Sequence, residues 1–251
     1  MAHLYGYRPR RVHRGVGARS PLSGTVTATD ERERMREIFT AELMALGDDL
    51  AAMSRLVHSA IDQAGTAMLT ADLALAEQVI AADHTIDALE RDLDERCVLL
   101  IAQQQPVAGD LRVVISALRM SSSLERMGDL ARHLAEITRL RYPAAAIPEP
   151  LTDLFVQMHE GAVRIAGEVT AVLQNRDVTM AAAIDSDDDL LDRLHDETFS
   201  ATLGGRYDLA PQQVVDVTLA ARYFERFGDH AVSVANRVVY LVTGEDVGHR
   251  R

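Results

Sequence analysis

Apolar residues recur every three or four positions along almost the whole chain from Met35 onward. That spacing places them on one face of an α-helix, whereas a half-buried strand needs strict alternation of apolar and polar residues. No stretch alternates for long enough to predict a strand. The pattern therefore predicts six long helices, at about residues 31–68, from 71 to the break at Gln105-Pro106, and at about 107–141, 151–174, 178–203 and 210–243.

Residues that break helices separate these segments. Thr70 is the expected N-cap of the second helix, with Asp72 in its first turn, because side-chain oxygens satisfy free backbone N–H groups there. Pro106 ends that helix, since proline lacks a donor and disfavours helical geometry in the preceding residue. The segment YPAAAIPEP (142–150) is the strongest internal linker. We therefore expect an all-α fold of two tandem three-helix bundles, residues 35–141 and 151–245, after a disordered tail, residues 1–34.

The expected tail and the rest of the chain differ in charge. Residues 1–34 mix Gly, Pro, Ser, Thr and Arg without an apolar period, which is typical of disorder. Seven Arg and three acidic residues give this tail a net charge of +4, so the remainder of the −12 chain carries −16. Such an acidic part argues against nucleic acid, whose binding depends on neutralised phosphates, and favours metal cations or basic protein surfaces.

Two further features of composition bear on location. The single cysteine, Cys97, lies in an apolar helical stripe and is expected to be a buried thiol in a reducing compartment. No apolar run reaches the roughly 18 residues needed to span a bilayer, so no transmembrane helix is predicted.

The two halves share sequence as well as helix order, which indicates an internal duplication. Glu125, Arg126, Gly128, Asp129 and Ala131 recur one hundred residues later as Glu225, Arg226, Gly228, Asp229 and Ala231. The preceding helix aligns at an offset of 102, so that Asp83, Asp87, Glu90 and Asp94 correspond to Asp185, Asp189, Asp192 and Asp196. Each half thus carries acidic residues on two consecutive helices.

Spacings of three and four align the acids of each helix along one line, beside its apolar stripe. Consecutive helices joined by a short loop usually pack antiparallel, which brings the two acidic lines together. One interpretation is a cation site, since carboxylates with few histidines suit Mg²⁺, Mn²⁺, Ca²⁺ or iron. The alternative is a solvated acidic face with Arg126 and Arg132 as counter-ions. Gly128 and Gly228 weaken their helices, for which we expect close approach of a neighbouring helix or ion as the reason, with simple packing of small residues as the alternative.

Other catalytic patterns are absent from the sequence. It contains no glycine-rich phosphate loop with Lys, no nucleophile elbow and no His-Glu-x-x-His. His195 follows Asp192 by three residues, which is similar to the acid-x-x-His pair of carboxylate-bridged di-iron bundles. Glu-x-x-His itself does not occur. We therefore expect a protein without enzymatic activity, with a carboxylate-bridged metalloenzyme and a metal-free helical adaptor as the alternatives.

At these residues the chain resembles the PhoU family of regulators of bacterial phosphate uptake. The matching text is IAADHTIDALERDLDERCVLLIAQQQPVAGDLR (80–112) with LERMGDLA (124–131), and IDSDDDLLDRLHDE (184–197) with FERFGDHA (224–231). The similarity extends over about residues 35–245. One departure is that QQVVDVTLA (212–220) lacks the Asp-Leu-Arg found at 110–112, so the two halves are not expected to be equivalent.

The resemblance implies two tandem three-helix bundles and a carboxylate metal site in each. Some family members bind multinuclear iron or other metal ions there, so iron is the expected cofactor, with Mg, Mn or Zn as alternatives. By position, the implied metal ligands are Asp83, Asp87, Glu125 and Asp129 in the first half, and Asp185, Asp189, Glu225 and Asp229 in the second.

The resemblance also implies a function and partners. Family members are cytoplasmic adaptors, and no catalysis is associated with them. They link the ATPase of the phosphate ABC transporter to a sensor histidine kinase, and they hold phosphate-starvation signalling off when phosphate is plentiful. We therefore expect a negative regulator of phosphate homeostasis that acts in signal transduction. It would be peripheral to the inner membrane through its partners, with homodimerisation left open.

Overall fold

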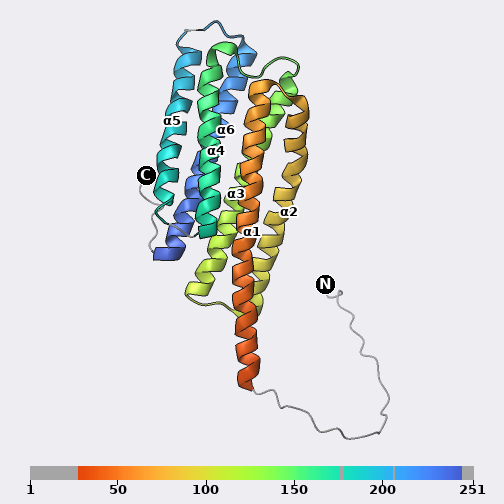
Figure 1. The fold of residues 1–251 in the computed structure, drawn as a ribbon, viewed down its shortest axis with the longest axis vertical. Helices are drawn as coiled ribbons and strands as arrows, with labels where there is room; N and C mark the ends of the chain where they lie inside the picture. The colour runs from red at the N-terminus through yellow and green to blue at the C-terminus, as the bar shows by residue number, and fades with distance from the viewer. Residues whose placement is uncertain (1–27, 176–177, 206, 245–251) are drawn as a thin grey trace, which may run out of the picture. The chain divides into compact units, whose positions relative to one another are not determined.

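The computed structural model describes residues 28–175, 178–205 and 207–244. No strand occurs within these ranges, and the prediction of an all-α fold with six long helices is confirmed. None of these helices is long and apolar enough to cross a membrane. The elements follow in the order α1 (Ala28–Thr70), α2 (Leu73–Gln104), α3 (Gly109–Arg141), the short 3₁₀ helix η1 (Glu149–Leu151), α4 (Thr152–Asn175), α5 (Ala181–Leu203) and α6 (Pro211–Thr243) (Figure 1).

The first helix begins earlier than the sequence pattern predicts. Residues 28–34 belong to α1, so the expectation of a disordered tail is wrong for them, while residues 1–27 lie outside the described part of the chain. The acidic and basic residues of 28–34 have no apolar period, but such residues are compatible with a helix. By their contacts, the described residues from Ile38 onward form one unit, which contains both halves of the repeat, and the first turns of α1 do not belong to it.

Local capping explains where the other helices begin and end. The N-cap of α2 is Asp72, whose carboxylate accepts a hydrogen bond from Leu75 N at 3.0 Å. Thr70, the predicted cap, is instead the last residue of α1, and its hydroxyl donates to Thr66 O at 2.7 Å. The predicted stop before Pro106 is confirmed, since α2 ends at Gln104.

The third helices of the two halves, α3 and α6, pack against each other in antiparallel directions (Figure 1). Near one end of this contact Arg141 Nε lies 2.7 Å from Asp216 Oδ2, and near the other the Arg112 guanidinium lies 5.3 Å from the centre of the Tyr240 ring. Helix α2 packs on α3, while α4 and α5 pack on α6. Each half therefore presents its second helix to the helix that carries its glycine motif.

The core is aliphatic, as the composition predicts, with a few large aromatic side chains in the second half. Phe155, Phe224 and Phe227 are fully buried, and the rings of Phe155 and Phe224 lie 6.4 Å apart. The linker 142–150 is not a free spacer, because Ala146 and Ile147 are buried in the same core. Burial of these apolar groups stabilises the helices far more than their intrinsic propensities do.

Candidate functional site

In the first half, a glycine brings the acidic lines of α2 and α3 together. A Cβ at Gly128 would lie 2.9 Å from Cδ1 of Ile86 and 3.5 Å from Oδ1 of Asp83. The missing side chain therefore lets α2 approach α3 closely, which is the reason predicted for this glycine. We call the four predicted ligands on these helices the first cluster: Asp83, Asp87, Glu125 and Asp129.

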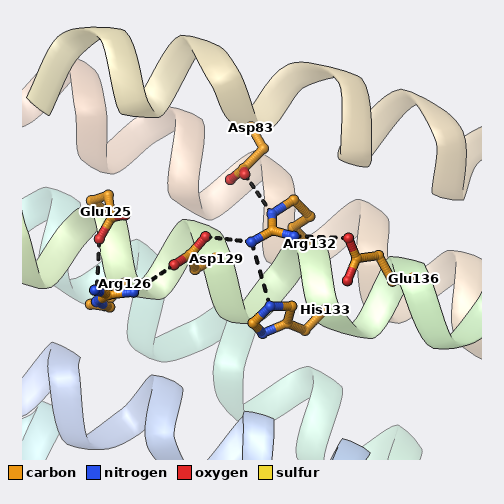
Figure 2. A network of polar contacts seen from close by, with 7 residues as sticks. All are labelled: Asp83, Glu125, Arg126, Asp129, Arg132, His133 and Glu136. Carbon is orange, nitrogen blue, oxygen red and sulfur yellow. Dashed lines mark hydrogen bonds and ion pairs between the residues drawn. The ribbon is translucent and has the colours of Figure 1, made fainter.

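An arginine lies among the carboxylates of the first cluster (Figure 2). Arg132 Nε lies 2.6 Å from Asp83 Oδ2, across the contact between α2 and α3. Its Nη2 donates to Asp129 Oδ1 at 2.7 Å, and its Nη1 donates to Glu136 Oε1 at 2.8 Å. One guanidinium thus bonds three carboxylates. Such charge-assisted hydrogen bonds are shorter and stronger than neutral ones.

A second arginine completes the network on the solvent side. Arg126 Nη1 donates to Asp129 Oδ2 at 2.8 Å, and Arg126 Nε lies 3.5 Å from Glu125 Oε2 (Figure 2). Each oxygen of Asp129 therefore accepts a hydrogen bond from an arginine. The Arg126 side chain is 60% exposed and that of Arg132 only 25%, so Arg132 is the cation that the protein holds inside the cluster.

The second half repeats this packing with different acidic residues from those predicted. Gly228 of α6 lies against α5, where an added Cβ would collide with Oδ1 of Asp188 and lie 3.2 Å from Cδ1 of Leu191. Asp188 is fully buried, whereas Asp185 and Asp189 are exposed. The alignment at offset 102 is therefore wrong by three residues.

The structure pairs Asp83 with Asp188 and Ile86 with Leu191, an offset of 105. By this register Asp87 corresponds to Asp192, and both are half-buried. The sequence does contain a signal for this register. In each half the residue before the second acid is apolar and packs on the glycine, since Ile86 precedes Asp87 and Leu191 precedes Asp192. The acidic run at 185–189 concealed this signal, since aspartates three residues apart share one face of a helix. We call Asp188, Asp192, Glu225 and Asp229 the second cluster.

Burial makes the negative charge of these clusters costly. It raises the pKa of Glu225, and the charge of Asp229 raises it further, against the opposing effect of Arg222. Burial and Asp129 raise the pKa of Glu125 in the same way. Burial also raises the pKa of Asp83, although the charge of Arg132 opposes this. A cation placed among these groups would stabilise their ionised forms.

His133 lies at the edge of the arginine network, with its Nε2 3.4 Å from Arg132 Nη2 (Figure 2). The His133 ring stacks 5.1 Å from that of Tyr223, and the His195 ring meets that of Phe199 edge-on at 4.9 Å. Burial lowers the pKa of His195, and the charge of Arg222 lowers it further, which favours a neutral ring. Cys97 is buried as predicted, and burial raises the pKa of its thiol to about 11. A thiol of that pKa is a poor nucleophile at neutral pH.

The two clusters differ in how well they fit a metal ion. In the first, a guanidinium already donates to Asp83 and Asp129, so the donors that a metal would use are taken. In the second, Arg222 donates to Oε1 of Glu225, but the buried Oε2 of this 9% exposed residue receives no hydrogen bond from any described residue, which suits a hard cation. Within the described ranges no three His, Cys, Asp or Glu side chains converge as a ready-made metal site. A metal ion would therefore have to draw the acids of the second cluster together.

In each half, acidic residues of the second and third helices lie beside a glycine of the third helix. This repeated arrangement defines a class of helical proteins built from two copies of one three-helix unit. The PhoU domain family matches residues 50–138 and 155–238, so each match covers one copy of the repeat. The chain belongs to the PhoU family.

Characterised relatives match nearly end to end. The phosphate-specific transport system accessory protein PhoU homolog 2 of Mycobacterium tuberculosis is 40% identical over 210 residues, which cover 84% of this chain and 99% of that protein. The PhoU homolog of Pseudomonas aeruginosa is 32% identical over 215 residues, covering 84% and 88%.

Solved structures agree with this assignment. The crystal structure of PhoU from Pseudomonas aeruginosa matches with a TM-score of 0.73 at 30% identity, covering 82% of this chain and 100% of that one. The phosphate transport system regulatory protein PhoU from Streptococcus pneumoniae matches with a TM-score of 0.75 at 26% identity, covering 83% and 99%.

Proposed function

We propose that this protein is a non-enzymatic, metal-binding regulator of phosphate uptake. It acts in the cytoplasm as an adaptor between the ATPase of a phosphate ABC transporter and a sensor histidine kinase. In that role it holds phosphate-starvation signalling off while phosphate is plentiful. The observation that carries the proposal is the 40% identity over 99% of a phosphate-specific transport system accessory protein.

The chemistry of the described residues supports an adaptor over an enzyme. Asp83, Glu125 and Asp129 of the first cluster are paired with arginines, and the one cysteine is a buried thiol of raised pKa. The acidic surfaces, from a chain of net charge −12, suit basic patches on partner proteins. Binding through such surfaces needs no reactive group, only helices held in a fixed arrangement.

Deletion of the gene tests the regulatory role. A reporter under a phosphate-regulated promoter is measured in cells grown with abundant phosphate, with and without the gene. We expect the reporter to be active only in the deletion strain and to be silenced again by the wild-type gene on a plasmid. A reporter that stays silent after deletion would refute the proposed regulation.

The metal-binding part of the proposal concerns the second cluster. Asp188, Glu225 and Asp229 would hold the ion, whose charge would offset the repulsion between buried carboxylates. Metal content is measured on protein purified without a His-tag, for the wild type and for Asp188→Asn. The matched control is Asp185→Asn, on an exposed residue one turn earlier in α5. We expect metal to be lost only in Asp188→Asn. Equal metal content in all three would favour a metal-free adaptor.

A further inference from the structure

Helices α3 and α6, which carry the glycine motif, differ at two positions where the first half has charged residues. At the offset of 100 that pairs Gly128 with Gly228, Arg132 corresponds to Val232 and Glu136 corresponds to Asn236. The first half therefore carries a cation and its local partner at positions where the second half has neither. Both differences concern the same side of the helix, because positions four residues apart are neighbours there. The arginine that pairs with an acid of the second cluster, Arg222, lies elsewhere: it corresponds to Ser122 and donates to Glu225 Oε1.

Arg132 compensates the buried negative charge of Asp83. Its guanidinium spans from α3 to Asp83 on α2, and the side chain of Asp83 is only 10% exposed. A carboxylate removed from water to this extent needs a compensating positive charge, because a buried charge left without its partner strongly destabilises the fold. Arg132 supplies that charge through three of its nitrogens, to Asp83, Asp129 and Glu136. Figure 2 shows the guanidinium between the acids of the two helices.

We propose that Arg132 is the resident cation of the first cluster, so that metal binding is confined to the second cluster. This rests on the metal-binding part of the proposed function. The first half of the duplication is then held together by a covalently tethered charge that cannot dissociate. The second half has Val232 at the same position and an Arg222 that pairs with Glu225, and a divalent cation from solution would add the charge that Arg132 supplies in the first half.

A guanidinium and a metal ion exclude each other in the first cluster. They compete for the same oxygens of Asp83 and Asp129, and their like charges repel at the few ångströms that separate these groups. Arg132 also stays charged at every pH at which the protein functions. Burial alone would lower its pKa, but hydrogen bonds to Asp129 and Glu136 raise it above its already high ordinary value. The contact between α2 and α3 is therefore independent of metal supply.

The proposal is tested by giving the first half the residue found in the second. Arg132→Val is compared with the wild type and with Arg126→Val, which removes the same charge from an exposed position and also contacts Asp129. Each protein is stripped of metal with chelator, and its Mn²⁺ stoichiometry is then measured by titration calorimetry. Circular dichroism verifies that each variant is folded.

We expect Arg132→Val to bind at least one more Mn²⁺ per chain than the wild type, and Arg126→Val to bind no more than the wild type. Adding Asp83→Asn to Arg132→Val should remove the gain. An unchanged Mn²⁺ count in folded Arg132→Val would overturn the proposal, and so would an equal gain in Arg126→Val. If Arg132→Val does not fold, Arg132→Gln replaces it, with Arg132→Lys as the variant that keeps the charge and should gain nothing.

The same titration separates this inference from the proposed function. A wild type that binds no Mn²⁺, beside an Arg132→Val variant that does, would support the resident cation and count against metal binding by the second cluster. A wild type that loses as much Mn²⁺ on Asp83→Asn as on Asp188→Asn would show that both clusters bind metal, and would overturn the inference alone.

Discussion

Replacing Gly228 with alanine should destabilise the protein, although alanine is the better helix former. In an unstrained helix the change would stabilise by about 1 kcal/mol. Here the new Cβ would collide with Oδ1 of Asp188 and lie 3.2 Å from Leu191, and both of those side chains are fully buried. Overpacking costs about 1–3 kcal/mol, and a direct collision with a buried carboxylate belongs in the upper part of that range, at about 2–3 kcal/mol, so we expect a net loss of about 1–2 kcal/mol.

Gly128→Ala is the matched comparison, since it occupies the same place in the first half. Its nearest neighbour is the terminal methyl group of Ile86, at 2.9 Å, which can rotate away. The helix preference then nearly cancels the crowding, and the change in the free energy of unfolding should stay within about 0.5 kcal/mol of zero.

Urea unfolding in the presence of chelator, followed by far-ultraviolet circular dichroism, measures both variants. The second measurement places Gly228→Ala in an Asp188→Ala background, where the obstructing carboxylate is gone. There the same substitution should cost much less or stabilise slightly, because only the 3.2 Å contact with Leu191 still opposes the helix preference. A Gly228→Ala variant as stable as the wild type, or the same loss in both backgrounds, would refute the assigned contact.

Three further predictions follow from individual contacts. Arg141→Leu leaves the carboxylate of Asp216, which is 4% exposed, without its ion pair, and should cost about 2–3 kcal/mol in urea unfolding; adding Asp216→Ser should recover most of this. Glu225 has a raised pKa, so the folded state binds its proton more tightly than the unfolded state does, and stability falls as pH rises from the ordinary value of 4.5 through the raised one. Glu225→Gln should therefore be more stable than the wild type at pH 7 without metal, with the difference shrinking towards pH 4.5, and equal pH profiles would contradict this. Cys97, with a thiol pKa of about 11, should react with a disulfide reagent at pH 8 only after unfolding, so rapid labelling of the folded protein would contradict its burial.

Much of the fold could be read from local patterns. The period of apolar residues predicts all six helices, and Pro106 marks a true helix end. These features depend on interactions within a few residues, which a sequence displays directly. The start of α1 was harder, because residues 28–34 have no apolar face and their helix continues from the segment that follows.

The register of α5 on α6 could not be settled in the same way. The run Asp185-Ser-Asp-Asp-Asp189 offers acids at several positions one turn apart, and any of them continues the acidic line. The choice depends on which side chain packs on Gly228, and the structure selects Leu191 with Asp188. Packing between helices decides this, since a shift of one turn preserves the helix face but changes every contact across it.

The sequence by itself determined that this is a duplicated helical protein with acids and a glycine at equivalent places in both halves. Only the tertiary structure decided which acids come together, and it showed that Arg132 reaches across from α3 to Asp83 on α2. The period of a helix is a local property of the chain. The partner of a buried charge depends on side chains about 50 residues apart that only packing brings within hydrogen-bonding distance.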